Sequence, residues 1–379
     1  MSYNRRVFLQ QALALGGLCL TAPAAALFPS RAAAAPRLAR GLAGRHLSPF
    51  FRPLADGFVQ CTLCPHACQV GPGERGSCGV RENRDGRYYS LVYGNPCAVN
   101  LDPIEKKPFF HVLPATLSLS LATAGCNLHC QFCQNWEISQ KRPEDTMNTA
   151  LSPAEAVRQA KEMGARSLAS TYVEPSIFFE YMLDLGREAK KAGLLKVMHS
   201  NGFLNAEPLG QLCEVLGAAC VDLKSVNPDY YRQICGGELA PVQATLRRLA
   251  QAKVHTEIVH LMVPTLNDDP AETRKLIRFV HDELSPDTPV HFTRFYPRYK
   301  LNNLPPTPVE TLTRARDLAL EMGLAYAYVG NVPGHPGEST YCPGCHTRLI
   351  ERVGYEVREV KMKDGRCPAC GRAVPGIWA

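Results

Sequence analysis

Three cysteines, Cys126, Cys130 and Cys133, follow one another with the spacing C-x3-C-x2-C. Thiolates this close on one short loop can bind three corners of a cubane iron–sulfur cluster. A closed structural site needs four ligands, so three thiolates leave one iron open. A structural zinc site or a disulfide is the alternative, but tetrahedral zinc needs a fourth ligand nearby. His129 lies between the cysteines and is expected to point away.

The residues around these cysteines resemble a known family. The strings 122–127 and 132–136 are similar to the cluster loop of the radical SAM superfamily, in the branch of the pyruvate formate-lyase activating enzymes. From about Cys61 to the C-terminus, the chain resembles the radical SAM member of the AmmeMemoRadiSam trio, which is encoded beside Memo-like and Ammecr-like proteins. The resemblance implies that S-adenosylmethionine binds the open iron of a 4Fe–4S cluster and is cleaved to a 5′-deoxyadenosyl radical. Phe132 and Asn135 are then expected to contact the cofactor.

Short apolar segments alternate with helical patterns after residue 113. The candidate strands are 117–125, 167–174, 195–201, 218–224, 255–264 and 289–296, with a seventh candidate at 325–330. The candidate helices are 153–163, 175–192, 207–216, 241–252, 270–283 and 308–322. This alternation predicts an α/β fold with a parallel sheet. The resemblance implies a partial (β/α)6 barrel of the TIM-like kind.

In such folds the chemistry lies at the carboxyl ends of the strands. The second candidate strand ends at Glu174, in a motif similar to the Tyr-Asn-Glu-Pro motif of the activases, from which Val173 departs. The resemblance makes Glu174 the candidate acceptor for the methionyl amine, and Asn201 at the third strand end a cofactor contact. Asp222 and Lys224 end the fourth strand and share one side of it. Lys224 is the candidate partner of the methionyl carboxylate, although strand-end ion pairs are equally common.

Two histidines lie on the later strands. His260 and His291 are candidates for contact with the ribose or the substrate, and each is equally well explained as a core histidine. Strand alternation puts His291 and Phe292 on opposite faces. The sequence does not say which face lines the interior of the barrel.

A second group of cysteines precedes the barrel. Its spacing is C-x2-C-x3-C-x9-C, formed by Cys61, Cys64, Cys68 and Cys78. Four thiolates can bind either zinc or an auxiliary 4Fe–4S cluster, and both remain open. His66 and Cys97 are alternative ligands, but are more simply a loop histidine and a packed cysteine. The charged segment 102–108 matches the same subfamily and is either an active-site entrance or a solvated charge run.

A third group lies near the C-terminus. Two C-x2-C knuckles contain Cys342, Cys345, Cys367 and Cys370. The alternating segments 348–353 and 355–361 between them predict a hairpin, so the module is expected to be a zinc ribbon, with rubredoxin-like iron as the alternative. The remaining cysteines Cys213, Cys220 and Cys235 have no such spacing and are expected to be packed or incidental.

The N-terminal residues predict an export signal. Arg5 and Arg6 precede an apolar stretch at 12–27 and small residues near 35, which is typical of a twin-arginine signal. The protein is therefore expected to be periplasmic or membrane-anchored, or cytoplasmic if the signal is not processed. The net charge of +7 falls to +4 without residues 1–35, which carry three arginines and no acid. This balance is too mild to indicate nucleic-acid binding. No later segment is apolar for long enough to span a membrane.

The expected organisation has four parts: a signal segment (1–35), a cysteine-rich extension (36–112), a radical SAM barrel (113–335) and a zinc-ribbon-like module (336–379). The expected function is hydrogen abstraction from a small molecule or peptide. A glycyl-radical activase and a non-enzymatic exported redox carrier or sensor are the alternatives. The expected partners are a low-potential donor of flavodoxin or ferredoxin type and Memo-like and Ammecr-like proteins.

Overall fold

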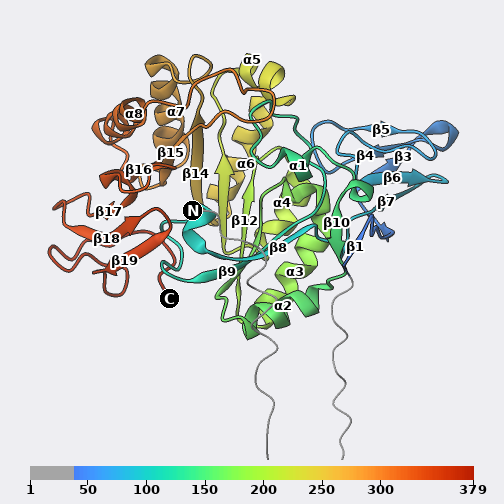
Figure 1. Cartoon of the computed structure of the whole chain (residues 1–379), viewed down its shortest axis with the longest axis horizontal. Helices are drawn as coiled ribbons and strands as arrows, with labels where there is room; N and C mark the ends of the chain where they lie inside the picture. Colours follow the sequence, from blue (N-terminus) through green and yellow to red (C-terminus); the bar gives the residue numbers. More distant parts are fainter. Residues whose placement is uncertain (1–37) are drawn as a thin grey trace, which may run out of the picture. The chain divides into compact units, whose positions relative to one another are not determined.

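Seven parallel strands form the centre of the molecule in a computed structural model that describes residues 38–379 (Figure 1). They lie in the sheet in chain order, each paired in parallel with the next. The strands are β9 (Leu117–Ala122), β11 (Ser167–Ser170), β12 (Leu195–Ser200), β13 (Ala218–Asp222), β14 (His255–Met262), β15 (Val290–Arg294) and β16 (Ala327–Gly330). Each falls inside a predicted strand segment, which confirms the α/β fold.

Helices follow most of these strands. The long ones are α2 (Pro153–Glu162), α3 (Phe179–Lys191), α4 (Ala206–Cys213), α6 (Leu239–Gln251), α7 (Pro270–Glu283) and α8 (Val309–Glu321), and the short ones are α1 (Trp136–Ser139) and α5 (Pro228–Tyr230). The local sequence explains where several helices begin. The side chains of Ser152 and Asp269 cap α2 and α7, and proline fills the first turn of both.

The two faces of the sheet pack against different partners. Met198, Ile258 and Phe292 belong to the large core that the helices share with one face of the sheet. Alternate residues such as Val197 and Val259 pack against a separate apolar group that includes Ile104 and Phe109. A segment that directly precedes β9 in sequence therefore covers the face opposite the helices.

The residues before β9 form more regular structure than the sequence predicted. Strand β8 (Ala98–Pro103) pairs antiparallel with β9 and completes an eight-stranded sheet. Three small sheets contain β1 (Leu38–Arg40), β2 (His46–Leu47), β3 (Phe51–Pro53), β4 (Val59–Cys61), β5 (Gln69–Val70), β6 (Arg81–Arg84), β7 (Arg87–Ser90) and β10 (Met147–Thr149). Strand β8 lies within the segment that the sequence assigned to the extension, so the extension contributes to the main sheet.

The C-terminal residues form a ribbon of three antiparallel strands, β17 (Thr340–Tyr341), β18 (Arg348–Val353) and β19 (Glu356–Val360). The predicted hairpin is confirmed, because β18 pairs with β19. Within residues 38–379, no helix has the length and apolar character needed to cross a bilayer. The predicted signal segment 1–35 lies outside the described residues.

Candidate functional site

The loop that carries Cys126, Cys130 and Cys133 begins just after β9, at the carboxyl edge of the sheet. Burial raises the pKa of the Cys126 thiol, and the nearby thiols of Cys130 and Cys133 add to this shift. The loop is fixed from outside, because the His129 N–H donates to the Cys235 carbonyl over 2.8 Å. Three soft thiols on one short loop at the edge of the sheet fit an iron–sulfur cluster.

The charged end of β13 faces this loop. The Lys224 ammonium lies 2.8 Å from one oxygen of Asp222, and His199 Nε2 lies 2.9 Å from the other. Burial opposes ionisation of Asp222, but Lys224 and His199 hold its pKa well below the usual range. The ammonium also lies near the Cys130 thiol and 5.6 Å from the centre of the Phe132 ring. The structure therefore brings Asp222, Lys224 and Phe132 together with the cysteine loop.

Cys235 is a neighbour of the loop that the sequence did not reveal. Its buried thiol lies near that of Cys130, and the interaction between the two is the largest cause of the raised pKa of Cys130. Cys235 ends a π-helical turn, Tyr231–Cys235, that directly follows α5. Cys235 is packed in the core, which was one of the two expectations for it, but no spacing rule connects it with residues a hundred positions earlier.

Glu174 and Asn201 occupy the neighbouring strand ends. The Glu174 carboxylate accepts hydrogen bonds from the Ser176 N–H, the Asn201 N–H and the Ser200 hydroxyl, over 2.7–3.0 Å. The Asn201 amide donates to Asn127 Oδ1 over 2.8 Å and lies 4.0 Å from the Cys126 sulfur. Both Glu174 oxygens are thus occupied by the protein, and the carboxylate positions Asn201 beside the cysteine loop.

The second strand end also contacts the loop through Asn135, whose amide donates to the Tyr172 carbonyl over 2.7 Å. Tyr172 has a positive φ of 67°, and its hydroxyl bonds to Asp102. Asp102 in turn pairs with Lys107, whose pKa is lowered to about 8 by burial. Asp102, Glu105 and Lys107 are all buried, so the alternative of a solvated charge run at 102–108 is wrong.

The two candidate histidines lie away from this group. His260 is on the helix side of the sheet, where Nδ1–H donates to the Leu223 carbonyl over 2.9 Å and the ring packs on Phe292. His291 is on the opposite face, where it pairs with the buried Glu257 over 2.7 Å and packs on Phe110. The contacts of both rings are those of core histidines. His291, rather than Phe292, is on the face that lacks helices.

The ribbon cysteines form a compact ligand set. The sulfurs of Cys342, Cys345, Cys367 and Cys370 all lie within 4.8 Å of one another, and no other group of three or more such ligands in residues 38–379 is this compact. Two of the sulfur pairs are 3.5 and 3.6 Å apart. This arrangement fits one tetrahedral ion.

The four cysteines of the extension line one small cavity, and neither alternative ligand joins them. They are Cys61, Cys64, Cys68 and Cys78. His66 Nε2 lies 2.7 Å from the Asn127 carbonyl, and Cys97 uses its backbone N–H to bond Ala122 next to β9. The four-cysteine site stays a prediction, and neither His66 nor Cys97 lines its cavity.

Comparison with known proteins identifies the family. A model described as "Radical SAM superfamily" matches residues 120–277, which include the cysteine loop and the ends of β11, β12 and β13. An uncharacterised protein of Methanocaldococcus jannaschii is 42% identical over 327 residues, covering 86% of this chain and 97% of that protein. The chain belongs to the radical SAM superfamily.

More distant relatives of this radical SAM protein are recognised at low identity. The pyruvate formate-lyase-activating enzyme of Listeria monocytogenes is 24% identical over 168 residues, which cover 41% of this chain and 66% of that enzyme. Among solved structures, SuiB of Streptococcus suis aligns with a TM-score of 0.45 at 12% identity, over 60% of this chain and 52% of SuiB. A domain of the activating enzyme of Bacteroides vulgatus aligns with a TM-score of 0.39 at 15% identity, over 44% of this chain and 99% of that domain.

Membership of the superfamily implies an enzyme that uses a 4Fe–4S cluster and S-adenosylmethionine. The donor set in the structure fits this pair of cofactors. Three thiols lie on one loop, no fourth cysteine has the loop's spacing, and the buried ammonium of Lys224 supplies positive charge beside them.

Proposed function

We propose that Cys126, Cys130 and Cys133 bind the 4Fe–4S cluster and leave one iron for the amino and carboxylate groups of S-adenosylmethionine. When bound, the cluster would supply the electron for cleavage of S-adenosylmethionine, and the 5′-deoxyadenosyl radical would serve to abstract hydrogen from a substrate C–H bond. The observation that carries the proposal is the meeting of the three thiols with the charged end of β13.

Side chains of the strand ends would hold the cofactor. Lys224 would bind the methionyl carboxylate, because its ammonium is the buried cation next to the loop. Asp222, held ionised by Lys224 and His199, would orient that ammonium. Glu174 acts as a positioning residue, since its oxygens already hold Ser200 and Asn201.

The proposed substrate is a small molecule or a peptide. A glycyl-radical activase is not favoured, because the match to the activating enzymes covers only 41% of this chain. A non-enzymatic redox carrier is not favoured either, because the family consists of enzymes that cleave a cofactor. We also propose that the fold is a partial (β/α)6 barrel and that the ribbon binds zinc. The chain is further proposed to be homologous to the radical SAM member of the AmmeMemoRadiSam trio.

The proposed setting follows from the sequence. We infer a low-potential electron donor of flavodoxin or ferredoxin type, and Memo-like and Ammecr-like proteins as partners. Arg5 and Arg6 support export by the twin-arginine route, so the proposed location is periplasmic or membrane-anchored. That route exports folded proteins, which suits a cofactor inserted before export.

The test is cofactor cleavage under anaerobic conditions. The reconstituted protein, given dithionite and S-adenosylmethionine, is expected to form 5′-deoxyadenosine. Cys130→Ala should lower this rate by about a hundredfold or more, because one cluster corner is lost. Cys213→Ala is the matched control, since Cys213 lies in α4 away from the loop. Equal rates in the two variants, or no product from the intact protein with its cluster verified, would contradict the proposal.

A further inference from the structure

The outer cysteines (Cys61, Cys64, Cys68 and Cys78) surround one cavity in the extension. The same cavity is lined by Leu63, Tyr88 and Arg81, all of which are buried. Cys61 is buried and the other three are partly buried, and all four are free thiols. Four soft ligands around one cavity form a site separate from the three-cysteine loop of the superfamily.

The ribbon cysteines show the sulfur–sulfur distances that are expected of a site for one ion. A tetrahedral zinc with Zn–S bonds of about 2.3 Å places its sulfurs about 3.8 Å apart. The ribbon sulfurs meet this condition, with the pairs at 3.5 and 3.6 Å. The outer cysteines do not form such a group, because no three of their sulfurs all lie within 4.8 Å of one another in the described chain.

Wider separation is what a cluster requires. Each thiolate of a cubane binds a different iron, so the thiolates lie further apart than those that share one ion. The superfamily loop behaves in the same way, since Cys126, Cys130 and Cys133 also fall outside the compact group. The outer cysteines therefore resemble the cluster-binding loop rather than the ribbon.

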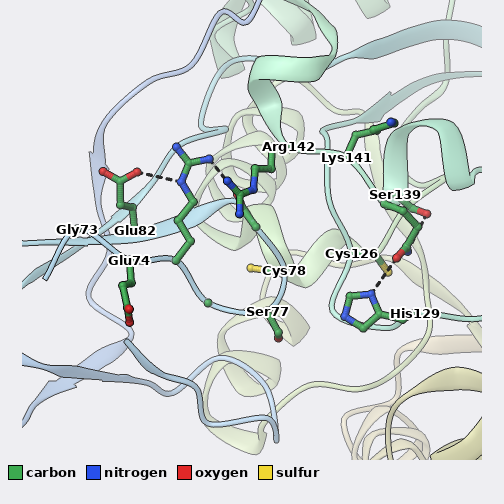
Figure 2. Close-up of a pocket in the computed structure, with 14 residues that line it drawn as sticks. Gly73, Glu74, Ser77, Cys78, Glu82, Cys126, His129, Ser139, Lys141 and Arg142 are labelled. Carbon is green, nitrogen blue, oxygen red and sulfur yellow. Dashed lines mark hydrogen bonds and ion pairs between the residues drawn. The ribbon is translucent and has the colours of Figure 1, made fainter. Parts of the chain in front are cut away.

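The outer site touches the cofactor-cleaving site directly. A Cβ placed on Gly125, which has a φ of +91°, would lie 2.6 Å from the Cys78 carbonyl oxygen, so only glycine allows this approach. His66 on the outer loop bonds the Asn127 carbonyl over 2.7 Å. Figure 2 shows Cys78 and Cys126 in the wall of one pocket of about 770 Å³.

We propose that the outer cysteines bind a second 4Fe–4S cluster, closed by four thiolates, that passes electrons to the cluster on Cys126, Cys130 and Cys133. A closed cluster has no open iron for a substrate, which leaves electron transfer as its chemistry. A low-potential iron–sulfur or flavin donor gives up one electron, the outer cluster is reduced by one electron, and that electron moves on to the inner cluster. The relay rests on the proposed function, whereas the presence of the cluster does not.

The presence of the cluster is tested by metal analysis of the full chain reconstituted anaerobically. We expect about eight irons with matching sulfide, and two reduced-cluster spins by electron paramagnetic resonance. The variant Cys64→Ser should contain about four irons, whereas Cys345→Ser should keep its iron and lose zinc. About four irons and two zincs in the unmutated protein would overturn the proposal, and this result requires no variant to fold.

The relay is tested by comparing two reductants. In Cys64→Ser, the rate of 5′-deoxyadenosine formation with a flavodoxin-type donor should fall at least tenfold more than the rate with dithionite, which can reach the inner cluster directly. Equal losses with both reductants would overturn the relay. If the intact protein shows two clusters but cleaves no cofactor with either reductant, the proposed function fails and the second cluster stands.

Discussion

The cysteine loop at the carboxyl edge of the sheet and the ribbon near the C-terminus use the same ligand atom in opposite settings. The ribbon sulfurs are close together, and Cys345 and Cys370 are exposed. The loop sulfurs are further apart, with Cys130 buried and Cys126 and Cys133 partly buried, and they lie next to the ion pair of Asp222 and Lys224. A site with four protein ligands needs no further ligand. A site with three protein ligands depends on the surrounding side chains to select the external ligand that fills the fourth position.

The same contrast holds for charge. Ribbon pairs such as Lys361 with Glu359 are exposed on both sides. Near the sheet, Arg81 and Glu180 form a buried bidentate pair. Exposed pairs contribute little to stability, whereas breaking a buried pair costs much more. The comparison thus predicts which changes matter in each region.

The largest expected effect is removal of the zinc proposed for the ribbon. Cys367→Ser, or treatment with a zinc chelator, should unfold the ribbon locally, because binding of a structural zinc supplies folding energy of about 10 kcal/mol. Hydrogen exchange should accelerate in β17–β19 and stay slow in β11–β14. Unchanged protection of the ribbon after metal loss would show that apolar packing alone holds it and would remove the contrast with the loop.

A smaller effect is expected at the buried ion pair. Lys224→Met should lower the free energy of unfolding by about 3 kcal/mol, because Asp222 stays charged and keeps only His199 as a partner. Lys361→Met, the matched change at the ribbon surface, should cost less than about 1 kcal/mol. Chemical denaturation of both variants measures the difference. Similar losses would mean that burial does not distinguish the two regions.

The smallest effect is a pH dependence. Lys196 is buried beside the Ser170 hydroxyl, 2.7 Å away, and burial lowers its pKa to about 7. Between this value and the pKa of an unfolded lysine, the unfolded chain binds one proton more than the folded chain, so stability rises with pH. The free energy of unfolding should increase by about 2 kcal/mol from pH 7 to 9.

Two lysine variants provide the control for this pH effect. Lys196→Met should remove the increase, because no buried amine remains to lose its proton, whereas Lys191→Met at an exposed position should retain it. Denaturant titrations at both pH values provide the measurement. An increase that persists in Lys196→Met would assign the effect to another group.

Much of the sheet could be predicted because parallel strands have a strong local signal. Each candidate strand from 117 to 330 contains an observed strand, and the caps at Ser152 and Asp269 lie where proline follows them. Strand alternation predicted Asp222 and Lys224 on one side, and they do pair, although β13 ends at Asp222 and Lys224 lies just beyond it. These features depend on neighbours in sequence.

The features that could not be predicted depend on distant contacts. Alternation separates His291 from Phe292, but only the segment around Phe110 determines that His291 lies on the face without helices. Cys235 reaches Cys130 through a π-helical turn that has no sequence signal. The hydrogen bonds that occupy Glu174 come from Ser200 and Asn201 on another strand.

Strand β8 limits how this chain can be inherited and rearranged. It lies in the cysteine-rich extension, yet all six of its residues pair with β9 of the main sheet. Recombination that exchanged residues 36–112 as a unit would leave an unpaired edge on β9, and such edges promote aggregation. The extension and the sheet are therefore expected to pass together from ancestor to descendant.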